Sequence, residues 1–228
     1  MATLSAARRT EVRPSMAGHP FCTLLINESD VQTFFPGPYL CYYDLPTPSL
    51  VQQAHDFIFD VIEQDGPFDG VIAFSQGAAL VASMMLQHAK TGSTETLFKV
   101  AVFAGATLPY NLDDEHCLSK HETEVLQMPD EDSEDERGYP TNPKTSTEPL
   151  LSRYHPEQET ARILIPTLHI IGEQDKFAPQ SRLVARLCGG EKRVVEHKEG
   201  HRMPSDGRHQ WKVLTAIAST IQAAYFNF

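Results

Sequence analysis

The feature that most constrains this chain is a serine placed between an apolar strand and an apolar helix. In the stretch FDGVIAFSQGAALVASMM, which covers residues 68–85, the apolar run 71–74 leads directly into Ser75, and Gly77 opens a long apolar segment. A buried hydroxyl without a partner costs free energy. Ser75 therefore needs either a structural role, as the cap of the following helix, or a chemical one.

The rest of the chain alternates between strands and helices. Thr47 is a good helix cap and Pro48 suits a first helical position; apolar residues at three-to-four spacing follow until Gly66 and Pro67 end the helix. Further helices are predicted over 76–90, 179–188 and 208–224, and strands over 21–26, 70–74, 97–106, 162–175 and 193–201. Residues 1–20 are expected to be irregular.

Strands that are almost continuously apolar and alternate with helices indicate a mostly parallel sheet with helices on both faces. The 228 residues suit one α/β domain, which we expect to span 1–228. In sheets of this kind, functional groups gather at the carboxyl ends of the strands.

Acidic residues are concentrated in one segment. The net charge is −11, and residues 111–137 hold eleven acidic and two basic side chains. The near-neutral remainder argues against a nucleic-acid partner, because phosphate binding needs clustered Lys and Arg. We expect 110–160 to be a polar insertion that is flexible over 128–149. A solvated loop is the simplest interpretation, and a lid or a docking site for a basic partner is the functional alternative.

The sequence also predicts where the protein resides. No segment approaches the roughly 18 consecutive apolar residues of a membrane span, so no membrane partner is expected. Residues 1–20 lack the apolar core of a secretory signal, although their Arg, Ser and Ala content leaves a mitochondrial presequence open. The cysteines form no CxxC pair, which predicts reduced thiols and a cytoplasmic location. They are Cys22, Cys41, Cys117 and Cys188.

Ser75 lies in a near match to the G-x-S-x-G nucleophile elbow, a tight turn from strand to helix that exposes the serine oxygen. Small residues two before and two after the serine relieve crowding in this turn. Here Ala73 replaces the first glycine and Gly77 keeps the second.

Asp175 and His201 each come near the end of a predicted strand, in the chain order serine, acid, histidine that this turn accompanies. His201 would take the proton of Ser75 during nucleophilic attack and return it to the leaving group. Asp175 would hold the imidazole in the right tautomer. This chemistry needs no metal or organic cofactor.

Two rivals remain open at this stage: His197, at a strand end, competes with His201, and Glu173 competes with Asp175. Three other candidates receive structural interpretations. His169 lies inside a buried strand as a core histidine, while Asp65 and Asp69 cap or turn the chain.

Four stretches resemble the fungal serine hydrolases of the FSH type, which include the lovastatin-type polyketide thioesterases and look like the human ovarian-tumour-suppressor-candidate hydrolase. These stretches are FPGPYLCYYD (35–44), DGPFDGVIAFSQGAAL (65–80), IPTLHIIGEQDKFAP (165–179) and EGHRMP (199–204). The serine motif alone would also fit acyl-protein thioesterases, whereas the Pro-Gly-Pro-Tyr stretch and the insertion favour the FSH type. The resemblance implies an α/β-hydrolase fold, with Ser75, Asp175 and His201 as the catalytic triad.

The resemblance also implies hydrolysis of an ester or thioester, often in fungal secondary-metabolite (polyketide) pathways. The substrate would be a small acyl compound, free or bound to a carrier protein, although the acidic insertion would not attract an acidic carrier. The backbone N–H of Gln76 would form part of the oxyanion hole. Tyr39, Tyr42 and Tyr43 could bind the acyl group, or could simply pack over the sheet edge.

One departure from the family pattern supports an alternative. Members usually open with a hydrophobic strand and a His-Gly-rich loop that supplies the second oxyanion N–H, and this strand is missing or degenerate here. Losing one such donor costs on the order of a hundredfold in rate. The alternative is therefore a catalytically impaired hydrolase-fold protein with a binding or scaffold role.

Overall fold

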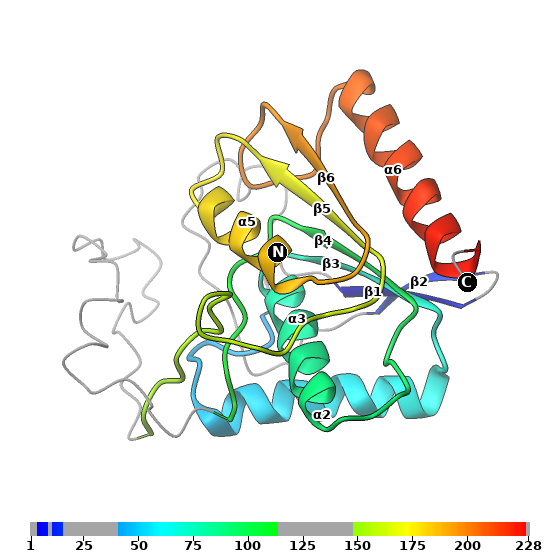
Figure 1. The fold of residues 1–228 in the computed structure, drawn as a ribbon. Helices are drawn as coiled ribbons and strands as arrows, with labels where there is room; N and C mark the ends of the chain where they lie inside the picture. The colour runs from blue at the N-terminus through cyan, green and yellow to red at the C-terminus, as the bar shows by residue number, and fades with distance from the viewer. Residues whose placement is uncertain (1–3, 9–10, 16–40, 114–147, 227–228) are drawn as a thin grey trace, which may run out of the picture.

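A six-stranded sheet organises the protein (Figure 1), in the order β2-β1-β3-β4-β5-β6. The computed structural model describes residues 4–8, 11–15, 41–113 and 148–226. Four neighbouring strands are parallel, which confirms the predicted mostly parallel sheet. They are β3 (Gly70–Phe74), β4 (Val100–Ala104), β5 (Thr167–Gly172) and β6 (Lys192–His197).

The position of each parallel strand explains its composition. Every residue of β4 and β5 is buried, because these strands have a strand on either side and helices over both faces. In contrast, β6 lies at the edge of the sheet and is mostly exposed. Its charged residues Lys192, Arg193 and Glu196 suit an edge strand, where charge discourages pairing with another chain.

Helices cover both faces of the sheet, as predicted. The described residues form the helices α2 (Pro48–Asp65), α3 (Gln76–Lys90), α5 (Ala178–Leu187) and α6 (Gly207–Phe226). Residues of α2, α3 and α5 share one apolar cluster, whereas α6 contributes Val213 to a second cluster with β4 and β5. Figure 1 shows α3 and α6 on opposite sides of the sheet, so the clusters to which they contribute lie on opposite faces.

Local sequence signals set the ends of α2. The side chain of Thr47 accepts a hydrogen bond from the Leu50 N–H at 3.3 Å, and Pro48 occupies the first helical position. At the other end, a Cβ on Gly66 would lie 2.2 Å from the Ile62 carbonyl oxygen, so only glycine fits there. The predicted beginning and end of this helix are both confirmed.

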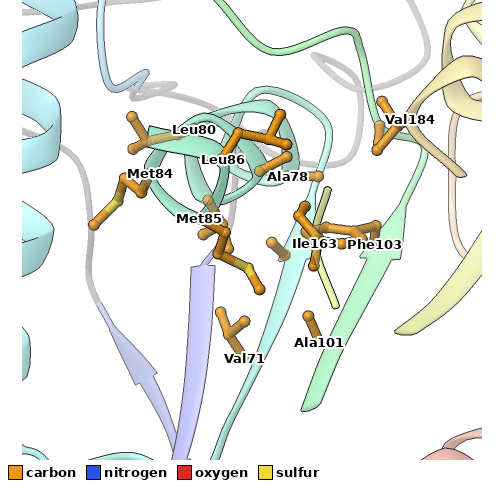
Figure 2. Packing of buried hydrophobic residues seen from close by; sticks show 14 of the residues in the cluster. Val71, Ala78, Leu80, Met84, Met85, Leu86, Ala101, Phe103, Ile163 and Val184 are labelled. Atoms are coloured by element: carbon orange, nitrogen blue, oxygen red, sulfur yellow. The ribbon is translucent and has the colours of Figure 1, made fainter. Parts of the chain in front are cut away.

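Helix α3 is the central element of the core. Its residues from Gly77 to Leu86 are all buried, which accounts for a segment that is apolar all round rather than on one face. Figure 2 shows Met85 of α3 above Val71 of β3 and Ala101 of β4. Because burial is continuous on this helix, the turn that leads into it is held firmly against the sheet.

The amino-terminal region differs from the prediction. Residues 1–20 were expected to be irregular, but β1 (Leu4–Arg8) and β2 (Glu11–Ser15) form an antiparallel hairpin, and β1 pairs antiparallel with β3. The prediction was wrong because neither strand is a run of β-branched or aromatic residues. Pro14 is tolerated because β2 is an edge strand. The strand predicted over 21–26 lies outside the described residues.

The end of the predicted insertion belongs to the packed domain. Residues 114–147 lie outside the described part of the chain, but Leu151 and Tyr154 are each only 1% exposed. The Leu151 N–H donates to the Pro46 carbonyl at 2.9 Å, which ties this segment to the residues preceding α2. The sequence analysis had included these two buried apolar residues in a polar insertion, because the composition of 110–160 is polar overall.

The cysteines partly depart from expectation. Cys188 is a free, buried thiol, and burial raises its pKa to about 12, so it stays protonated and unreactive. Cys41 is disulfide-bonded, which corrects the prediction of four reduced thiols. Cys22 and Cys117 lie outside the described residues. Within the described ranges, every helix is too short or too polar to span a membrane.

We predict that stability falls in mild acid because of buried histidines. Burial lowers the pKa of His169 to about 4, with a smaller effect from Lys192, whereas an unfolded histidine titrates near 6.5. Protonation therefore favours the unfolded state, and stability present above about pH 6.5 is lost as the pH falls towards 4. The contribution of His169 to the loss between about pH 7 and pH 5 is on the order of 2 kcal/mol.

Urea denaturation of the wild type and of His169→Val at these two pH values measures this contribution. The variant should lose less unfolding free energy on acidification, while His55, whose pKa burial also lowers to about 4, retains part of the dependence. Equal losses in the two proteins would contradict the prediction.

Candidate active site

Ser75 forms a strained turn between β3 and α3. Its φ of 54° and ψ of −121° make it the single non-glycine residue with positive φ among the described residues. Its N–H donates to the Ala104 carbonyl at 2.9 Å, and its carbonyl accepts from the N–H groups of Ala78 and Ala79. Backbone strain of this kind persists only where the surroundings enforce it, and it is typical of functional sites.

The alternative interpretation of Ser75 as a helix cap is wrong. Ser75 precedes the first helical residue, but its side chain makes no capping hydrogen bond. Its Oγ lies 2.8 Å from Nε2 of His201 instead. The hydroxyl therefore faces an imidazole, the partner that can take its proton.

His201 links Ser75 to Asp175. The Nδ1 atom of His201 lies 2.7 Å from Oδ2 of Asp175, whose side chain is fully buried. The other carboxylate oxygen accepts the Phe177 N–H at 2.8 Å. With one oxygen held by the backbone and the other facing the ring, the carboxylate fixes the direction in which His201 points.

The parallel sheet explains why three distant residues meet. Ser75 follows β3, Asp175 follows β5 and His201 follows β6, and all three strands run in the same direction. Their carboxyl ends therefore lie at one edge of the sheet. The structure brings together the three residues that the sequence singled out.

The rival residues lie elsewhere. His197, at the end of β6, is buried, and its Nδ1 lies 3.3 Å from the Glu199 N–H nitrogen rather than near Ser75. Glu173 is paired with Lys198 at 2.6 Å, on the surface. His169 is 1% exposed and bonds Thr167 at 3.2 Å, as expected of a core histidine. Asp69 is paired with Lys99.

Comparison with known proteins identifies the family. A family model described as "Serine hydrolase (FSH1)" matches residues 43–213. The chain belongs to the FSH1 family of serine hydrolases. With the parallel sheet and the strand-to-helix turn at Ser75, family membership confirms the predicted α/β-hydrolase fold.

The chain is also similar to several fungal proteins named as hydrolases or esterases. The chain is 28% identical to "Hydrolase FUB4" of Fusarium oxysporum f. sp. lycopersici, over 74% of this chain and 72% of that protein. It is 28% identical to "Esterase alnB" of Emericella nidulans, over 78% of this chain and 76% of that protein. Among solved structures, the mouse α/β hydrolase domain-containing protein 10 matches with a TM-score of 0.47 and 16% identity, covering 75% of this chain and 69% of that chain.

Three residues that the sequence analysis did not single out surround the imidazole of His201 in this FSH1 member. We call Phe74, Phe177 and Gly105 the cradle. The ring of His201 lies 4.9 Å from that of Phe74 and 5.2 Å from that of Phe177, measured between centroids. Gly105, with φ of 52°, approaches from the end of β4, and a Cβ there would lie 3.1 Å from two ring atoms of His201. The sequence points to only two of these neighbours of His201. Phe74 directly precedes Ser75, and Phe177 follows Asp175 by two residues.

The other residues predicted for the site differ in where they lie: one adjoins Ser75, two are in the core, and one is outside the described residues. Gln76 is the first residue of α3, so its N–H has no acceptor within its own helix. Tyr42 and Tyr43 are 8% and 5% exposed and belong to the core cluster, where they pack against other side chains. Tyr39 lies outside the described residues.

We predict that Gly105→Ala disrupts the contact between Ser75 and His201. The new methyl group would push against a ring that is already held by Asp175, Phe74 and Phe177, so the ring must shift by a few tenths of an ångström and its alignment with Ser75 changes. The rate at which a fluorophosphonate probe labels the protein should fall about tenfold or more, as expected when a nucleophile loses its base.

Gly92→Ala is the matched control for this variant. Gly92 also has positive φ, 72°, but nothing lies within 4 Å of an added Cβ. Both alanines incur a similar backbone cost of about 1 kcal/mol, but only the change at position 105 reaches His201. Equal labelling by both variants would show that the cradle does not control the histidine.

Proposed function

We propose that this FSH1 family member hydrolyses an ester or a thioester through an acyl-enzyme formed on Ser75. The observation that carries the proposal is the unbroken hydrogen-bonded series from Ser75 to His201 to Asp175, built on a serine with a strained backbone. The match to serine hydrolases and the names of the relatives support the same reaction class.

In the first half of the proposed reaction, Oγ of Ser75 attacks the carbonyl carbon while Nε2 of His201 takes the hydroxyl proton. Asp175 holds the ring and stabilises its cation. The N–H of Gln76 donates to the oxygen on which negative charge develops. The tetrahedral intermediate then collapses, and the leaving alcohol or thiol takes the proton from His201.

In the second half, water takes the place of the leaving group. His201 accepts a proton from this water, whose oxygen attacks the acyl carbon. The second tetrahedral intermediate releases the carboxylic acid, and the proton returns to Oγ of Ser75. The net reaction consumes one water and regenerates the free serine.

The substrate class follows from the resemblance to the family. We propose a small acyl ester or thioester, free or attached to a carrier protein, within fungal secondary-metabolite biosynthesis in the cytoplasm. The leaving group is an oxygen in one case and a sulfur in the other, and both can accept a proton from His201. Paired esters and thioesters of the same acyl group would distinguish these two substrates.

One observation favours the alternative of an impaired, binding protein. β1 pairs with β3 in the antiparallel direction, with Leu4 opposite Ala73 and Ala7 opposite Gly70. The carboxyl end of β1 therefore points away from Ser75. In the family pattern, by contrast, the loop after the first strand supplies the second oxyanion N–H.

Labelling by a fluorophosphonate probe, followed by intact mass, separates the two functions. We expect the wild type to gain one adduct and Ser75→Ala to gain none, because only an activated serine attacks the phosphorus. Circular dichroism shows whether both proteins are folded. A folded wild type that gains no adduct would exclude the active enzyme and support the binding role.

A further inference from the structure

The side chain of Gln76 connects the serine turn to a distant segment of the chain. Its Oε1 accepts the Tyr42 N–H at 2.8 Å, and its Nε2 donates to the Tyr43 carbonyl at 2.7 Å. The residue next to Ser75 therefore holds two consecutive residues that lie more than thirty positions earlier. Among neutral side chains, only Asn and Gln combine an acceptor and a pair of donors in one planar group.

The segment that Gln76 holds is part of an aromatic wall, which we define as Tyr42, Tyr43 and Tyr110. The ring of Tyr43 meets that of Tyr110 edge to face, at 5.9 Å between centroids. Tyr43 is so thoroughly buried that desolvation raises its pKa well above the usual range. The wall is therefore a packed, mostly apolar body beside the serine turn, in which Tyr42 and Tyr43 are buried and Tyr110 is half-buried.

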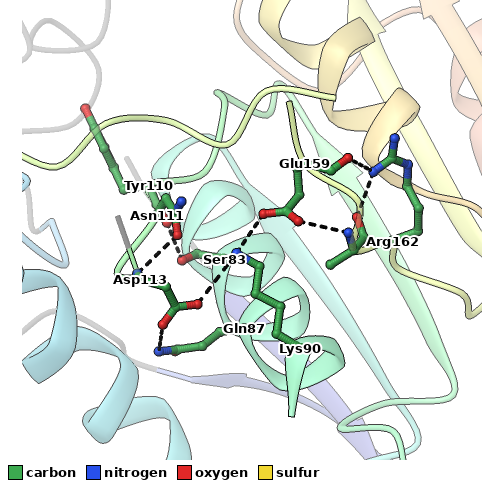
Figure 3. A network of polar contacts seen from close by, with 9 residues as sticks. Ser83, Gln87, Lys90, Tyr110, Asn111, Asp113, Glu159 and Arg162 are labelled. Atoms are coloured by element: carbon green, nitrogen blue, oxygen red, sulfur yellow. Dashed lines mark hydrogen bonds and ion pairs between the residues drawn. The ribbon is translucent and has the colours of Figure 1, made fainter. Parts of the chain in front are cut away.

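Further contacts fix Tyr110 within this wall. The hydroxyl of Ser83, on α3, donates to the Tyr110 carbonyl at 2.6 Å (Figure 3). The guanidinium of Arg153 donates to the Tyr110 hydroxyl at 2.6 Å, and its carbon lies 4.1 Å from the centre of the ring. At the Tyr110 end the wall is thus held by α3 and by Arg153, and at the Tyr42–Tyr43 end by Gln76.

The proposed reaction indicates which part of the substrate lies on the same side of Ser75 as the wall. His201 must reach the leaving group to protonate it, so the leaving group lies on the side of the β5 and β6 loops. The acyl chain then extends towards the opposite side. The segment that meets Gln76 immediately precedes α2, and α2 lies across α3 from β5 and β6 (Figure 1).

We propose that Gln76 is a positioning residue for acyl selection: its side-chain amide holds the aromatic wall beside Ser75, and the wall receives an apolar acyl chain. The proposal rests on the proposed function and extends it to a substrate class, esters with extended apolar acyl groups. It also gives Gln76 a role separate from that of its backbone N–H, which every substitution except proline retains.

Two variants of similar size test the proposal. Gln76→Met removes both hydrogen bonds. Gln76→Glu retains the acceptor for Tyr42 but places a carboxylate against the Tyr43 carbonyl, and protonation of that carboxylate restores a donor. The readout is the ratio of kcat/KM for p-nitrophenyl octanoate to that for p-nitrophenyl acetate, because titration of His201 affects both esters and cancels in the ratio.

We expect Gln76→Met to lower this ratio roughly tenfold at every pH, the scale of loss when buried polar groups are left unpaired. For Gln76→Glu the ratio should be low at about pH 8 and recover towards the wild-type value at about pH 5, because the carboxyl group regains its proton. A general loss of folding stability would not produce this pH-dependent recovery. An increase in KM for the octanoate should account for most of the loss.

Gln87→Met is the matched control, since Gln87 is also on α3 and its amide bonds His55 and Asp113 instead of the wall. Its ratio should equal that of the wild type. If the Gln76 variants lose activity equally on both esters, or if Gln76→Glu shows no recovery in acid, the positioning role is wrong while the hydrolase function stands. If the wild type hydrolyses neither ester and takes no fluorophosphonate, both proposals fail.

Discussion

The strained backbone of Ser75 is the constraint on which the rest of the site depends. A non-glycine residue with positive φ costs on the order of 1–3 kcal/mol, so the surrounding structure must enforce it. β3 on one side and the continuously buried α3 on the other supply that enforcement. The hydrogen bonds from Ser75 to Ala104 and from Ala78 and Ala79 to Ser75 leave the turn little freedom. The result is a side-chain oxygen that faces His201 rather than capping the helix.

Around this oxygen, the site is built from two groups of contacts with different purposes. On one side, Asp175 and the rings of Phe74 and Phe177 restrict His201 to one orientation. On the other, the side chain of Gln76 ties the turn to the aromatic wall. The two groups meet only at the turn itself. We therefore propose that proton transfer and acyl recognition are separable properties of neighbouring residues, even though both depend on one short segment.

The N-terminal hairpin raises the main mechanistic question about this FSH1 member. On one side of β3, the parallel β4 brings its carboxyl end to Ser75, whereas on the other side the antiparallel β1 directs its carboxyl end away from Ser75. In the proposed mechanism, sheet stability and oxyanion stabilisation therefore place different demands on the direction of the strand beside β3. A strand in either direction can satisfy the hydrogen bonds of β3, but only a parallel one ends next to the serine.

The sequence alone determined the parallel strands, the described helices and the three residues that meet at the sheet edge. Apolar runs predicted the buried parallel strands, Thr47 and Gly66 set the ends of α2, and chain order with strand-end position selected Ser75, Asp175 and His201. Only the tertiary structure decided which residues support them. The approach of Gly105 to His201, the bonds of the Gln76 side chain, and the burial of Tyr154 all join residues distant in the chain, and no local pattern encodes such contacts. The hairpin at 4–15 was missed for the same reason: its strands have weak intrinsic preference, and pairing with β3 supplies what their composition does not.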